Sequence, residues 1–134
     1  MPAYSFQERF IPFLLDESKR QTVRKERART AGYARQGSTI YLYYGMRTKY
    51  CRKIGEGICT EVWPITITED SVYVSGLKLD HPDLFAWCDG FRPEGTTISN
   101  PSGAFDLMLR FWRQTHELPF QGVVIFWKDF KPTK

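Results

Sequence analysis

The chain is poor in the residues that bind metals or form disulfides. It has three cysteines, Cys51, Cys59 and Cys88, and two histidines, His81 and His116. None of them forms a CxxC pair or a set with zinc spacing, so we expect no metal site. An odd number of scattered cysteines favours a reducing compartment, and we expect a cytoplasmic protein.

Long apolar runs and glycine-rich nucleotide loops are also missing. No run approaches the roughly 18–20 apolar residues of a membrane span. The opening MPAYSFQERF lacks the pattern of a secretory signal. Neither GxxxxGK[ST] nor GxGxxG after a strand occurs, and we expect no cofactor. The 134 residues are 42% hydrophobic and 16% aromatic, which predicts one packed domain over residues 1–134.

Acidic residues are scarce in the first part of the chain. Residues 1–53 carry 12 Lys/Arg against 4 Asp/Glu, whereas residues 54–134 carry 7 against 11. Between Lys19 and Lys53, Glu26 is the only acid. If these cations share a face, they favour an anionic partner. The alternative is that they solvate one edge of the fold.

The apolar patterns predict helices and strands in separate blocks. We expect a short helix at 6–16, strands at 38–44, 57–68 and 71–79, and a helix at 81–91. A loop at 91–103 precedes the clearest helix, 102–116, which Ser102 can cap, and a final strand covers 121–130. Strands dominate the middle and helices are segregated, which predicts an α+β domain with a small mixed β-barrel or curled sheet and flanking helices.

Four segments resemble the ASCH domain of the PUA-like superfamily. They are FQERFIPFLLDESKRQTVR, STIYLYYGMRTKYCRKIG, FAWCDGF and FQGVVIFW. The family opens with a short helix, then a Ser-Lys element and a Thr-x-Arg strand, which here are Ser18-Lys19 and Thr22-Val23-Arg24. Its later acidic-Gly-Phe step matches Asp89-Gly90-Phe91.

The resemblance implies a small PUA-like β-barrel whose cleft faces RNA or nucleotides. One small bacterial member deacylates acetylated cytidine with a Thr, a Lys and a Glu, and another member is described as a ribonuclease. Carried over, Lys19 and Thr22 match the Lys and Thr, and Asp89 stands nearest to the Glu. Side chains alternate along a strand, so Lys19 and Thr22 converge only if residues 19–21 form a turn.

The chemistry of these three residues suits a hydrolase. A threonine hydroxyl attacks once a base takes its proton, a lysine can be that base, and an acid can hold the ammonium or move a proton. The alternative is structural: threonine is a common strand residue, and Lys19 can be an ordinary cation at a helix C-terminus.

Cations and aromatic residues gather around the same segments. The residues that we expect to contact nucleic acid are Arg20, Arg24, Arg27, Arg47, Lys49, Arg52 and Lys53. The cations of GMRTKYCRKIG are interleaved with Tyr43, Tyr44 and Tyr50, a pattern that suits phosphate contacts and base stacking on a single strand. The expected stacking residues are Tyr44, Trp87 and Phe91. The alternative is that the aromatic rings belong to the core.

Three functions therefore remain open. The first is a module that binds RNA, single-stranded nucleic acid, a nucleotide or a modified nucleoside. The second is a hydrolase, either an amidohydrolase on acetylated cytidine or a ribonuclease. The third is an interaction protein that uses the fold to bind another protein. The sequence leaves the oligomeric state open.

Overall fold

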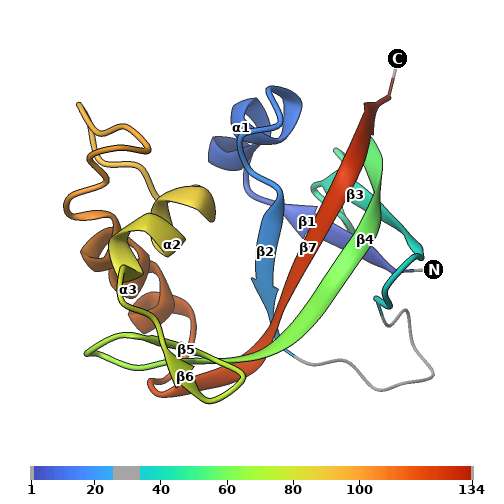
Figure 1. The fold of residues 1–134 in the computed structure, drawn as a ribbon. Coiled ribbons are helices and arrows are strands. Elements are labelled where there is room, and N and C mark those ends of the chain that lie inside the picture. The colour runs from blue at the N-terminus through green and yellow to red at the C-terminus, as the bar shows by residue number, and fades with distance from the viewer. Residues whose placement is uncertain (1, 26–33, 134) are drawn as a thin grey trace. The chain divides into compact units, whose positions relative to one another are not determined.

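The computed structural model describes residues 2–25 and 34–133 (Figure 1). The elements in chain order are β1 (Ala3–Phe6), η1 (Glu8–Phe10), α1 (Ile11–Leu15), β2 (Gln21–Arg24), β3 (Thr39–Tyr44), β4 (Arg52–Ile67), β5 (Val72–Val74), β6 (Leu77–Lys78), α2 (Pro82–Cys88), α3 (Ala104–Thr115) and β7 (Phe120–Pro132). The α+β prediction is confirmed. No helix among the described residues is long and apolar enough to cross a membrane.

The strands form one mixed sheet with the order β1-β3-β4-β5-β6, and β7 pairs with both β2 and β4. β1 runs parallel to β3, whereas β3 and β4 are antiparallel. The expected barrel is wrong in this respect, because the sheet formed by the described strands is open and does not close on itself. Barrel closure needs pairing between strands at the ends of the sheet, and β1, β2 and β6, which end the described sheet, do not pair with one another.

The chain divides into two compact units whose boundaries fall inside β2, β4 and β7. The first unit comprises Met1–Thr22, Glu26–Val62 and Ile125–Lys134, and the second comprises Val23–Lys25 and Trp63–Val124. In the first unit, alternate residues of β1 and β3 are buried, as the two-residue period of a strand requires. The Phe6 and Trp127 rings meet edge to face at 6.2 Å, so β1 and β7 contribute to the same apolar core.

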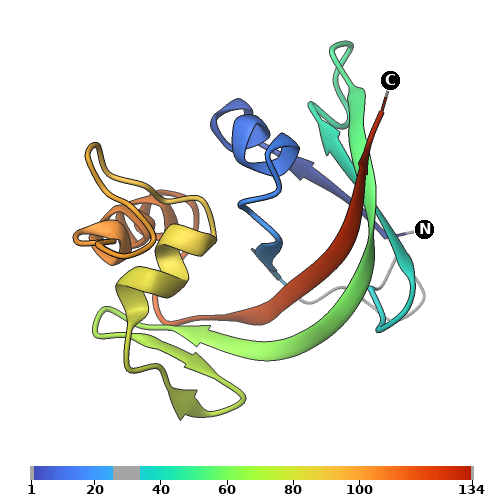
Figure 2. The same ribbon diagram turned by 45° about the horizontal axis from the view of Figure 1, so that its top comes forward.

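Helices α2 and α3 lie side by side in the second unit (Figure 2). α3 buries the stripe that the sequence predicts, and Trp112 stacks on Phe120 at 4.4 Å. The predicted Ser102 cap is wrong. Gly103 is the N-cap residue, with φ of 85°, and the Asp83 carboxylate of α2 accepts a hydrogen bond from Phe105 N at 2.8 Å. The cap therefore comes from a neighbouring helix, which ties α3 to α2.

Candidate functional site

A tight turn places Lys19 between α1 and β2. Asp16 Oδ1 accepts a hydrogen bond from Ser18 N at 2.8 Å, and Glu17 has a φ of 64°. Lys19 N then donates to Phe13 O at 3.0 Å. β2 begins only at Gln21, so Lys19 precedes the strand and the alternation of strand side chains does not apply to it.

The Lys19 side chain is buried, with 2% of its surface exposed. Its Nζ donates a hydrogen bond to Gln21 O at 2.7 Å. The same atom lies 5.0 Å from the centre of the Phe10 ring and 5.8 Å from that of Phe6. Lysine is almost never buried without such contacts, because the ammonium gives up its hydration. The aromatic faces and the carbonyl oxygen partly replace that hydration.

The other two candidate catalytic residues are buried as well. Thr22, on β2, is 5% exposed, and Asp89, at the C-terminal end of α2, is 4% exposed. Lys19 and Thr22 belong to the first unit and Asp89 to the second. The full set of buried polar residues described is Lys19, Gln21, Thr22, Ser71 and Asp89. All three predicted residues are therefore among the few polar side chains that the described residues bury.

The predicted phosphate contacts fall into two groups. Arg20 is exposed and Arg24 half-buried at the two ends of β2, while Arg27 lies outside the described residues. The remaining four cations, Arg47, Lys49, Arg52 and Lys53, lie in or next to the turn that joins β3 to β4.

Residues 45–53, which we call the basic turn, carry cations that lie over tyrosine rings. The distances from the cation to the ring centre are 5.2 Å for Lys49 over Tyr50, 5.3 Å for Arg52 over Tyr44 and 5.1 Å for Lys53 over Tyr41. Lys53 Nζ also donates to Glu56 Oε2 at 2.9 Å, and this hydrogen bond raises the pKa of Lys53.

The aromatic residues predicted to stack on bases differ in exposure. Tyr44 is half-buried beneath Arg52. The Trp87 ring is covered on one face by the Arg92 guanidinium, 3.8 Å from the ring centre, and its Nε1 donates to Thr96 Oγ1 at 3.2 Å. Phe91 is 2% exposed and packs on Phe111 at 5.4 Å. Phe91 thus lies in the core of the second unit, which was the alternative interpretation of that ring.

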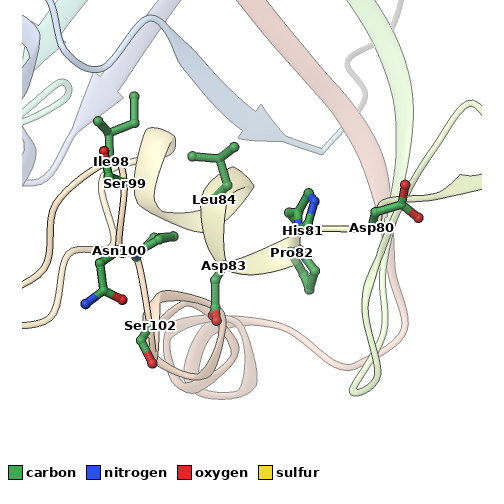
Figure 3. A pocket seen from close by; sticks show the side chains of 10 residues that line it. Asp80, His81, Pro82, Asp83, Leu84, Ile98, Ser99, Asn100 and Ser102 are labelled. Atoms are coloured by element: carbon green, nitrogen blue, oxygen red, sulfur yellow. The ribbon is translucent and has the colours of Figure 1, made fainter.

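Sequence reasoning missed a pocket of about 410 Å³ in the second unit (Figure 3). The Leu84 and Ile98 side chains form its exposed apolar part. Its remaining lining is Asp80, His81, Pro82, Asp83, Ser99, Asn100, Pro101 and Ser102. No sequence motif marks it, because its walls come from a helix start and a loop with ordinary turn composition. No group of three or more His, Cys, Asp or Glu among the described residues could hold a metal ion.

A second hollow, of about 390 Å³, lies in the first unit beside β4 and β7. Its lining is Glu56, Gly57, Ile58, Asp129, Phe130 and Lys131. Glu56 is already paired with Lys53. The hollow mixes both signs of charge and shares no residue with the predicted site.

Comparison with protein-family models, curated proteins and solved structures gives no match. The likeness to ASCH domains therefore rests on the four sequence segments quoted above.

Proposed function

We propose that the chain is an ASCH-like domain that binds RNA or nucleotides through its basic first unit. The observation that carries this proposal is the segregation of charge between the units. The first unit contains 13 Lys/Arg and 7 Asp/Glu, whereas the second contains 6 and 8. A surface of one sign attracts a partner of the other, and a phosphate backbone offers one negative charge per nucleotide.

Within the first unit, the basic turn supplies the most accessible cations. Arg47, Lys49 and Arg52 are exposed and have no carboxylate partner among the described residues. An ion-paired cation must break its pair before it contacts phosphate, whereas these three need not. The PUA-like architecture implied by the resemblance is part of the proposal, with an open sheet in place of the barrel.

The test is the salt dependence of RNA binding, measured by fluorescence anisotropy with a labelled single strand of mixed sequence. Three phosphate contacts predict a slope of about −2 for log K against log salt, so affinity should fall about twentyfold between 50 and 200 mM salt. No binding at 50 mM salt, or binding that salt does not weaken, would refute the proposal.

A charge-matched pair of variants locates the surface. Lys49→Gln/Arg52→Gln should lower the slope by about 1.4, since each lost contact to a single strand accounts for about 0.7. Lys78→Gln/Arg110→Gln removes two exposed cations from the second unit and should leave the slope unchanged. If both double variants lower the salt slope equally, net charge and not the basic turn governs binding.

A second candidate function is hydrolysis, and the burial of Lys19 and Thr22 within the first unit favours it. A lysine that burial deprives of hydration can take the proton from a threonine hydroxyl, which makes the hydroxyl a nucleophile. Acetylated cytidine and single-stranded RNA are the substrates to test, with product release followed by chromatography. Thr22→Val keeps the shape of the side chain and removes the hydroxyl, so turnover by wild type but not by Thr22→Val would support this function. Equal turnover by both proteins would remove Thr22 from the mechanism.

A further inference from the structure

The basic turn is held in a defined shape by its own hydrogen bonds. Thr48 N and Thr48 Oγ1 both donate to Gly45 O, at 3.1 and 2.6 Å, and Tyr50 N donates to Thr48 Oγ1 at 3.1 Å. Cys51 N donates to Thr48 O at 3.2 Å. Gly45 and Arg47 have positive φ angles of 64° and 68°. A non-glycine residue in this region costs conformational energy, so these hydrogen bonds hold a conformation that the free chain would rarely adopt.

This turn presents one large aromatic ring to solvent. Tyr50 is 66% exposed, the most exposed aromatic residue among those described. Lys49 Nζ lies 5.2 Å from its ring centre, and no other ring or cation contact to Tyr50 occurs among the described residues. The ring therefore contributes little to the core, and most of its surface is available to a ligand. The sequence pattern indicates stacking by the tyrosines interleaved with the cations of this turn, and Tyr50 is the exposed one among them.

We propose that Tyr50 is a stacking platform for an unpaired base, so that the basic turn prefers single-stranded nucleic acid to duplex. This inference rests on the proposed function, since it names the substrate class for the same surface. Bases in a duplex are already stacked on one another, whereas a single strand can place a base on an exposed ring. The cations on either side of Tyr50 in the sequence supply contacts to the flanking phosphates; they are Arg47, Lys49 and Arg52.

The chemistry of the turn favours a strand over a free anion. A free phosphate would contact the cations but not the Tyr50 ring. A free base would stack on the ring but would not contact the cations. A nucleotide chain presents both groups at every step of its backbone. The nearest acid in sequence on the C-terminal side is Glu56, which is paired with Lys53, so no carboxylate of the turn itself repels the backbone.

The test compares three proteins on two ligands. Wild type should bind a single-stranded RNA at least about fivefold more tightly than the same strand in a duplex. Tyr50→Leu should weaken single-strand binding at least about fivefold, which corresponds to the lower end of ~1–3 kcal/mol for one stacked base. Tyr50→Phe keeps the ring and should bind within about twofold of wild type. Because Tyr50 is largely exposed, neither change should affect folding.

The salt slope separates stacking from charge. Tyr50→Leu should lower the affinity without changing the slope, whereas Lys49→Gln should reduce the slope by about 0.7. If wild type binds RNA in a salt-dependent way but prefers duplex, or if Tyr50→Leu binds as tightly as wild type, the stacking inference is overturned and the proposed function stands. If wild type binds no RNA at low salt, both are overturned.

Discussion

Replacing the buried Lys19 tests whether its side chain is packed as the structure shows. Lys19→Ala removes three buried methylene groups, at about 0.8 kcal/mol each, or ~2.4 kcal/mol. It also removes the hydrogen bond from Nζ to Gln21 O, and losing such a hydrogen bond costs ~0.5–3 kcal/mol. From these contacts we expect Lys19→Ala to lower the free energy of unfolding by roughly 3–5 kcal/mol.

Lys19→Met is the matched variant, because it keeps an unbranched apolar side chain of similar length and lacks the ammonium. This variant lacks the hydrogen bond to Gln21 O but avoids burying a charge. We therefore expect Lys19→Met to lower the free energy of unfolding by about 2 kcal/mol less than Lys19→Ala does. Urea unfolding followed by tryptophan fluorescence measures both. Thermal unfolding should separate the two variants by roughly 8 °C, at about 4 °C per kcal/mol for a chain of this size.

Two results would refute this reasoning. If Lys19→Ala unfolds within about 0.5 kcal/mol of wild type, Lys19 is not a packed, buried side chain. If Lys19→Met is as unstable as Lys19→Ala, the ammonium and not the stem carries the contribution. The comparison also matters for enzymology: loss of turnover in Lys19→Ala would be ambiguous because that variant is unstable, so Lys19→Met is the better variant for activity.

Two substitutions and one alkylation experiment test the packing within the units. Gly55→Ala places a Cβ atom 2.5 Å from Lys131 O, an overlap with backbone that should lower the free energy of unfolding by ~1–3 kcal/mol in urea; unchanged stability would refute this approach of β4 to β7. Asp83→Ala removes the carboxylate that caps α3, and a loss of ~1 kcal/mol in the same assay is expected; no loss would mean that the contact is not a functional cap. Burial raises the pKa of the Cys59 thiol, so an alkylating reagent at pH 8 should modify exposed Cys51 before Cys59, as peptide mapping would show, and equal rates would contradict the burial. Because burial raises the pKa of the folded Cys59 thiol above that of the unfolded one, its contribution to folding stability is complete below the ordinary cysteine pKa and is lost as pH rises from there through the raised pKa.

Elements with strong local patterns could be predicted from the sequence. The stripe of apolar residues predicts α3 with a start only two residues before the observed one. The runs of β-branched and aromatic residues predict β3 and β7. β1 was missed because Ala3–Phe6 is too short to show a period; it is a strand because it pairs in parallel with β3. Residues 52–56 of β4 were missed because Gly55, and Gly57 at the start of the predicted strand, interrupt the strand pattern. Both positions require glycine because a Cβ atom there would lie too close to atoms of β7.

The candidate site could be predicted only as far as residue chemistry allows. Sequence reasoning pointed to Lys19, Thr22 and Asp89, but their burial depends on contacts between distant segments, such as the approach of Phe6 to Lys19. It also pointed to the cations of the basic turn and to the tyrosines between them. It did not single out Tyr50 as the exposed ring, because exposure is a property of the fold. The open sheet differs from the expected barrel for a similar reason: closure depends on which strand edges meet, which no local pattern encodes.

The burial of Lys19 and the exposure of Tyr50 make the two proposed functions experimentally separable. Changes at Tyr50 or at the exposed cations of the basic turn disturb few packing contacts, so they should alter RNA affinity with little effect on stability. Changes at Lys19 should lower the free energy of unfolding, so any loss of turnover in these variants must be compared with their loss of stability. A loss of RNA binding in Tyr50→Leu with unchanged unfolding, together with intact binding in Lys19→Met, would place recognition on the basic turn and not at the buried residues. The reverse pattern would place it at the buried residues, and the basic turn would then serve only to attract the strand by its charge.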